Sequence, residues 1–101
     1  MDGEGLSFLG RKLGSSFVTR VVTIAPADSR PYVESEWRDA LVVVECGEVD
    51  LECRAGGHRR FGRGAVLSLT GLGLRALHNT GLEPVVLVAV SRRAGGDGEI
   101  G

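Results

Sequence analysis

Short apolar segments, each bounded by turn residues, are the feature that most restricts the fold of this chain. Residues 16–24 are dense in valine and threonine and are soon followed by Pro26, and residues 85–90 read Val-Val-Leu-Val-Ala-Val. Such segments are short for a helix, and β-branched side chains pack well on a pleated sheet. We therefore predict strands at residues 16–24 and 84–91.

Further strands are predicted between these two segments. The segment 39–46 contains an entirely apolar run at residues 41–44, which suits a strand buried on both faces, and Gly47 marks a bend after the segment. Residues 48–53 alternate between polar and apolar side chains, as in a half-buried strand. The other predicted strands lie at 59–61, 65–69 and 74–78, and the turns or loops at 25–31, 55–58 and 79–81. About seven or eight short strands without a helix predict an all-β sandwich or barrel.

The length of the chain limits it to one domain. With 101 residues it can build one hydrophobic core, and its 16 glycines agree with many turns. The two ends are glycine-rich and weakly patterned. We therefore expect an N-terminal arm at residues 1–15, a β domain at 16–92 and a flexible C-terminal tail at 93–101.

The charge balance argues against two classes of partner. The formal net charge is −1, so no overall field draws the chain to nucleic acid or to an anionic membrane. Asp2 and Glu4 lead into no long apolar run, so we expect no signal peptide, no membrane span and a cytoplasmic location. Lys12 is the only lysine, and this dominance of arginine favours a bacterial source.

The two cysteines are too few for a disulfide framework, so we expect both thiols to be reduced. Cys46 continues the alternation of residues 40, 42 and 44, which predicts that it lines the interior of the barrel. Cys53 follows Val49 and Leu51 in the next alternation, which predicts a place in the core.

The spacing of glycines and one asparagine resembles the two sequence motifs of the cupin superfamily. In the first motif, Gly47 falls on the last glycine, Ala40 on the glutamate, Glu34 and Glu36 on the two histidines, and Asp28 on the first glycine. The resemblance covers roughly half of the chain and implies a small antiparallel β-barrel of the jelly-roll type.

The second motif begins at Gly64 and ends at Asn79 with its spacing intact. Its proline and glycine become Thr70 and Leu72, and its histidine becomes Arg75. Cupins hold a metal ion with imidazoles and a carboxylate, but here all four ligand positions differ. A guanidinium cannot ligate a metal and repels a cation, so we expect neither a metal nor another cofactor.

The two histidines do not restore the metal site in this interpretation. His58 falls in the predicted hairpin loop, where it is solvated. His78 comes three positions after Arg75, which places the two side chains on opposite faces of a regular strand.

The resemblance makes four residues candidates for ligand binding, namely Glu34, Glu36, Trp37 and Arg75. If the alignment holds, the two glutamates and Arg75 point into the mouth of the barrel, where Arg75 pairs with one carboxylate. Such a pair more often neutralises charge than performs chemistry. In the alternative interpretation Arg75 binds an anionic group and a glutamate moves a proton. Trp37 either stacks on a ligand or fills the core.

Three functions are compatible with these residues. We favour metal-independent, cupin-like binding of a small molecule, with a regulatory role. The second is a metal-independent enzyme of the isomerase, epimerase or cyclase type that uses the three charged residues, so whether the chain is an enzyme stays open. The third is a dimeric interaction scaffold without a ligand. A charged cavity favours the first two, and an interior filled by Val42, Leu77 and Trp37 favours the third. The resemblance implies a homodimer in each case.

Overall fold

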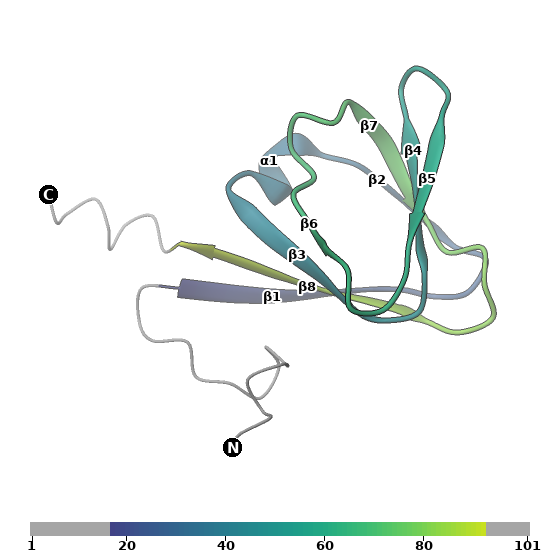
Figure 1. Ribbon diagram of the computed structural model, residues 1–101, viewed down its shortest axis with the longest axis horizontal. Helices are drawn as coiled ribbons and strands as arrows, with labels where there is room; N and C mark the ends of the chain where they lie inside the picture. Colours follow the sequence, from purple (N-terminus) through teal and green to yellow (C-terminus); the bar gives the residue numbers. More distant parts are fainter. Residues whose placement is uncertain (1–16, 93–101) are drawn as a thin grey trace, which may run out of the picture.

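Two four-stranded antiparallel sheets make up the computed structural model, which describes residues 17–92. One sheet has the strand order β1-β8-β3-β6 and the other β2-β7-β4-β5 (Figure 1). The elements are β1 (Phe17–Ile24), β2 (Ser29–Pro31), α1 (Glu34–Trp37), β3 (Ala40–Cys46), β4 (Val49–Cys53), β5 (His58–Phe61), β6 (Val66–Leu67), β7 (Leu74–His78) and β8 (Val85–Arg92). This architecture confirms the predicted all-β barrel.

The core lies between the two sheets and uses every second residue of the central strands. Val22 of β1 and Val44 of β3 both lie opposite Leu87 of β8. In the second sheet, Leu51 of β4 lies opposite Leu77 of β7. All five side chains are buried in one cluster, and each contributes ~1.5–3 kcal/mol through the removal of apolar surface from water.

Three elements differ from the sequence-based prediction. The segment predicted as a loop at 25–31 contains the short edge strand β2, which ends at Pro31. Proline has no N–H group to donate, and an edge strand tolerates this because one of its sides has no partner strand. The helix α1 was not predicted; it is a single turn in which the amide of Glu36 donates to the carbonyl of Val33 at 3.0 Å. The strand predicted at 65–69 is reduced to the two residues of β6.

Two irregularities change which way side chains face. The register of β3 against β8 shifts between Val44 and Cys46, and that of β4 against β7 shifts between Glu52 and Cys53. An extra residue in a strand moves the residues after it to the other face. Cys46 is accordingly exposed, so the prediction that it lines the interior is wrong. Cys53 packs against the core as predicted.

Some expectations fall on residues that the structure does not describe. The arm at residues 1–15, the first residue of the domain at 16–92 and the tail at 93–101 belong to this group, so the division of the chain stays a prediction. Within residues 17–92, no helix has the length and apolar character needed to cross a membrane.

Candidate functional site

Apolar side chains fill the barrel interior, where the resemblance places the metal site. Trp37, Val42 and Leu77 are each 0% exposed and belong to the single core cluster. A cavity of about 80 Å³ remains on the inner face of the second sheet, lined by Leu51, Cys53, Arg59, Phe61, Leu72 and Leu74. Ligand pockets usually have volumes of roughly 300–1,000 Å³, so this cavity is too small for an organic ligand without rearrangement.

Glu34 and Glu36 lie on α1, and both are exposed. The hydroxyl of Tyr32 donates a hydrogen bond of 3.0 Å to Glu34 Oε1, and Arg30 Nη2 lies 3.3 Å from both carboxylate oxygens of Glu36. The prediction that these two glutamates point into the barrel mouth is therefore wrong. The helical turn, which the alignment did not include, directs them into solvent.

Arg75 contacts a different carboxylate from the one predicted. Its side chain is 59% exposed, and its Nε lies 3.5 Å from Glu52 Oε2. His78 Nε2 lies 2.8 Å from the other oxygen of the same carboxylate. Two predictions are thus wrong: Arg75 does not pair with a glutamate of α1, and His78 does not lie on the opposite face. The register shift between Glu52 and Cys53 brings both side chains to one face.

Trp37 fills the core, as one of its two predicted roles requires. Arg20 covers the indole, with its guanidinium carbon 4.8 Å from the ring centroid, and its Nη2 donates to the carbonyl of Glu36 at 2.6 Å. The four predicted ligand-binding residues therefore line no common cavity in the described part of the chain. Their role in ligand binding stays a prediction.

A polar network on the outer face of the second sheet was not predicted from the sequence. Ser29 Oγ and His78 Nδ1 share a hydrogen bond of 2.6 Å, and His78 Nε2 in turn contacts Glu52. Beside it, His58 Nδ1 lies 2.9 Å from Asp50 Oδ2, and the two imidazole centroids are 6.1 Å apart. These residues come from β2, β4, β5 and β7.

The network shows how strand pairing creates contacts that spacing along the chain does not reveal. His58 is the first residue of β5 and not part of the hairpin loop as predicted, which places it opposite Glu52 and next to Asp50. Asp50 is buried, and its Oδ1 has no hydrogen-bond partner among the described residues. The only sequence signal was the alternation of Asp50 and Glu52. Within residues 17–92, no three side chains of His, Cys, Asp or Glu are grouped so as to hold a metal ion.

The tyrosine beside Glu34 gives a pH-dependent prediction. Burial, then the hydrogen bond to Glu34 and the charge of that carboxylate, raise the pKa of Tyr32 from 10.0 to about 12. A raised folded-state pKa favours the neutral phenol, so its contribution to stability is complete below about pH 10 and is lost as the pH rises through about 12. Because Tyr32 is the only tyrosine, ultraviolet absorbance of the phenolate should show a single transition near pH 12.

The control for this titration is Glu34→Gln, which removes the charge next to the phenol and should lower the midpoint towards the ordinary value. Circular dichroism over the same range separates titration of the folded chain from unfolding. A wild-type midpoint at the ordinary tyrosine value, with the fold intact, would contradict the contact between Tyr32 and Glu34.

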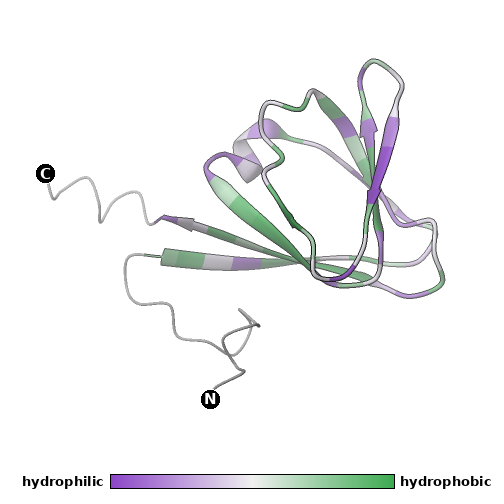
Figure 2. Cartoon of the chain, in the orientation of Figure 1, coloured by the Kyte–Doolittle hydropathy of each residue, from purple (hydrophilic) through white to green (hydrophobic). Residues whose placement is uncertain are grey.

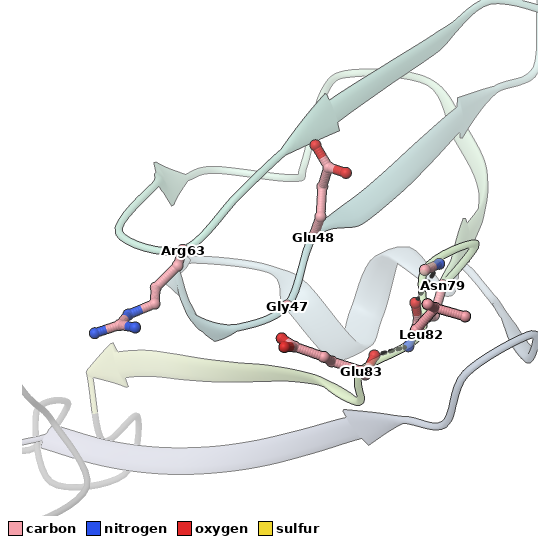
Figure 3. Close-up of a pocket in the computed structure, with 7 residues that line it drawn as sticks. Gly47, Glu48, Arg63, Asn79, Leu82 and Glu83 are labelled. Atoms are coloured by element: carbon pink, nitrogen blue, oxygen red, sulfur yellow. Dashed lines mark hydrogen bonds between the residues drawn. The ribbon is translucent and has the colours of Figure 1, made fainter.

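A second cavity lies outside the barrel interior, at the end of β3 farther from α1. It has a volume of about 390 Å³ and is lined by Gly47, Glu48, Arg63, Asn79, Gly81, Leu82 and Glu83 (Figure 3). Asn79 is buried and fixes the wall formed by the β7–β8 connection. Its Nδ2 donates to the carbonyls of Ile24 at 3.0 Å and Glu83 at 2.7 Å, and its Oδ1 accepts from the amide of Gly81 at 2.9 Å. We refer to this cavity as the Gly47 cleft.

Comparison with known proteins supports the fold and leaves the function open. No protein-family model matches the sequence, and no curated protein matches it either. Solved structures do match. A cupin 2 conserved barrel domain protein from Salinispora arenicola CNS-205 is 22% identical with a TM-score of 0.59, and the match covers 75% of this chain and 62% of that one.

Two further structures show the same likeness. The Cnp3 cupin domain of Schizosaccharomyces pombe is 18% identical with a TM-score of 0.62, and the match covers 88% of this chain and 61% of that one. The cupin 2 domain of an XRE-family transcriptional regulator from Enterobacter cloacae is 20% identical with a TM-score of 0.53, and the match covers 74% of this chain and 79% of that one. The chain thus spans less than two thirds of the first two. The two antiparallel sheets and these likenesses together establish that the chain has the fold of the cupin superfamily.

Proposed function

We propose that this chain is a cupin-fold interaction module that pairs with a second copy of itself through the outer face of the sheet β1-β8-β3-β6. The observation that carries the proposal is an apolar surface on this face, combined with an interior that is already filled. Figure 2 shows that much of β3 and β8 has the colour of hydrophobic residues, in contrast to the hydrophilic β5. A face of this kind gains free energy when a partner covers it.

The first row of this face runs across all four strands. By register, Val21 of β1 lies beside Val88, Val88 beside Val43, and Val43 beside Val66 of β6. Val21 and Val66, at the two edges, are 49% and 60% exposed. Val43 and Val88, in the middle, are buried but lie outside the core cluster between the sheets.

The next row consists of Thr19, Val90 and Leu41, of which Leu41 is 56% exposed. Neither row contains a charged side chain, although Arg92, opposite Phe17 in the row beyond Thr19 and Val90, lies at the margin of the same face. A two-fold interface brings the same patch of both copies together, so the exposed Val21, Leu41 and Val66 supply the apolar area of the contact, whereas Val43 and Val88 are already buried and add none. This supports a second copy as the occupant.

The size of the face sets the expected strength of pairing. Because β6 contributes only two residues, the face consists mainly of β1, β8 and β3; three strands ~4.8 Å apart with about eight residues at ~3.3 Å each give a footprint of roughly 380 Å². Stable specific interfaces usually bury about 800 Å² on each partner. We therefore expect an equilibrium between monomer and dimer that depends on protein concentration.

Small-molecule binding is the second candidate function. The Gly47 cleft, with about 390 Å³, favours it more than the filled interior does. Among the similar structures, the domain from Enterobacter cloacae belongs to a transcriptional regulator, which supports a regulatory setting for such a module. An isomerase-, epimerase- or cyclase-like reaction through Glu34, Glu36 and Arg75 is less favoured, because the Arg75 side chain pairs with Glu52 and with neither of the two glutamates of α1 among the described residues.

Replacement of Val21 by aspartate should shift the chain to the monomer. Two-fold symmetry places the new carboxylate in the interface twice, so we expect the dissociation constant to rise at least about ten-fold, as for an unpaired charge that loses water. Sedimentation velocity over a series of protein concentrations measures the change.

The matched control is Val33→Asp, because Val33 is 46% exposed but precedes α1 and does not belong to the face. It should dimerise as the wild type does, and circular dichroism should show that both variants are folded. A wild-type chain that stays monomeric at every concentration, or a Val21→Asp variant that dimerises normally, would refute the proposal.

A further inference from the structure

Ser29, His78 and Glu52 form a chain of hydrogen bonds across three neighbouring strands of the second sheet. Ser29 Oγ lies 2.6 Å from His78 Nδ1, and His78 Nε2 lies 2.8 Å from Glu52 Oε1. Strand pairing sets these contacts, because Ser29 lies opposite His78, and Glu52 is two residues from Asp50, the partner of His78 in β4. A hydroxyl next to an imidazole that a carboxylate orients is the arrangement of an activated serine nucleophile.

The hydrogen-bond partners of His78 decide which of its ring nitrogens carries the proton. A carboxylate can only accept, so the Nε2–H of the neutral ring donates to Glu52, and Nδ1 keeps its lone pair. That lone pair faces the hydroxyl of Ser29, which therefore donates to it. Arg75 Nε lies 3.5 Å from the other oxygen of Glu52 and places a positive charge beside the carboxylate. His78 is thus oriented as a base towards Ser29.

Ser29 is accessible to a reactant, whereas the two residues behind it are largely shielded. Ser29 is exposed on the edge strand β2, while the side chains of His78 and Glu52 are 24% and 25% exposed. None of the three lines either of the two cavities described above, so neither cavity selects the group that reaches Ser29. The amide of Ser29 donates to Asp28 Oδ1 at 2.9 Å and is not free to stabilise an oxyanion. The arrangement therefore suits a small, activated acyl donor and not a peptide bond.

We propose that Ser29 is a nucleophile that accepts the acyl group of small activated esters, with His78 as its base and Glu52 as the residue that positions the imidazole. The Ser29 oxygen bonds to the carbonyl carbon of the ester while its proton moves to His78 Nδ1. The bond from that carbon to the leaving oxygen then breaks, and this oxygen keeps the electron pair and takes the proton from His78. Water, activated by the same imidazole, hydrolyses the acyl-serine to the free acid and restores Ser29.

Acetylation by p-nitrophenyl acetate tests the proposal. Samples quenched in acid at early times and analysed by peptide mass spectrometry give the initial rate of acetylation at each serine. Ser68 is the internal reference, because it is an exposed serine outside this chain of hydrogen bonds. A positioned base usually contributes about 10²–10⁴-fold, so we expect Ser29 to react at least about 100-fold faster than Ser68.

Substitutions separate the base from the residue that positions it. His78→Gln keeps a polar side chain but cannot take up the proton, so Ser29 should lose at least about 100-fold in rate. Glu52→Gln keeps the shape of the side chain without its charge and should lose at least about ten-fold. Glu52→Asp keeps the charge on a shorter side chain. If the carboxylate stabilises the imidazolium, the aspartate variant reacts faster than the glutamine variant, whereas a merely structural role predicts the reverse order.

The matched control is His58→Gln. His58 is the neighbouring imidazole, with its centroid 6.1 Å from that of His78, but its Nδ1 contacts Asp50. This variant should acetylate Ser29 at the wild-type rate. The rate at Ser68 should be the same in every variant, and circular dichroism should show that each is folded.

Three results would overturn the assignment of Ser29 as a nucleophile. These are equal rates at Ser29 and Ser68 in the wild type, a wild-type rate at Ser29 in the His78→Gln variant, and the reverse order of the two Glu52 variants. The three residues lie on the sheet β2-β7-β4-β5 and the valine rows on the other sheet. Sedimentation of these variants should therefore show the wild-type monomer–dimer equilibrium, so failure here is distinguishable from failure of the pairing proposal.

Discussion

Replacement of Trp37 by alanine is expected to lower the free energy of unfolding by about 3–5 kcal/mol, the usual cost of deleting a buried aromatic side chain. Trp37 is fully buried, and the guanidinium of Arg20 lies over its ring. Its removal leaves a void in the one core cluster that joins the two sheets. Single domains are stable by only about 5–15 kcal/mol, so this loss is a large share of the total.

Urea unfolding followed by circular dichroism measures the effect, because Trp37 is the only tryptophan and its replacement removes the fluorescence signal. Trp37→Phe keeps an aromatic ring below Arg20 and loses no hydrogen bond, since the indole Nε1 has no partner in residues 17–92. We expect it to cost about 1–2 kcal/mol.

The control for both substitutions is Ser35→Ala, at an exposed position on the same helical turn, which should change the stability by less than about 0.5 kcal/mol. An unchanged urea midpoint for Trp37→Ala would mean that the indole does not hold the sheets together.

The strands could be predicted from the sequence because their signal is local. In β1, β3, β7 and β8 the apolar residues recur with the period of a pleated strand or fill it completely, and the boundaries were predicted to within one residue. Burial of Val22, Val44 and Leu87 then agrees with this alternation, because the three side chains share the face of their sheet that packs into the core.

The candidate site could not be predicted in the same way, because it depends on small departures from regular strands. One register shift turns Cys46 outward, and another brings Arg75 and His78 to the same carboxylate of Glu52. Each shift inverts the faces of the residues beyond it, and no residue type marks it reliably. The single turn of α1 is equally hard to foresee, since four residues carry almost no helical period.

Contacts between distant strands could not be predicted from the sequence for a different reason. Ser29 and His78 are 49 positions apart and meet only because β2 pairs with β7. The Gly47 cleft likewise gathers residues from three connections whose relative positions follow from the closed barrel. The resemblance to the cupin motifs rests on the spacing of Gly47, Gly64 and Asn79, and two of these residues, Gly47 and Asn79, line that cleft. The motifs were nevertheless interpreted only for their metal ligands.

Replacement of Gly47 by alanine is expected to lower the free energy of unfolding by about 2–4 kcal/mol, the sum of a left-handed backbone conformation and a steric clash. The φ of Gly47 is +75°, and a Cβ there would lie 2.6 Å from the Pro84 carbonyl oxygen and 3.0 Å from Val85 Cα. Both neighbours are backbone atoms at the start of β8, so they cannot rotate away. The bend between the sheets therefore requires glycine.

Gly71→Ala is the matched control, because Gly71 has a φ of +84° but no atom within 4 Å of an added Cβ. It carries the conformational penalty alone, about 1–2 kcal/mol, and the difference between the two variants in urea unfolding isolates the contact with β8. If Gly47→Ala cost no more than Gly71→Ala, the β7–β8 connection would be able to move away from the bend. The base of the cleft would then not be preformed, and ligand binding there would have to include the ordering of that connection.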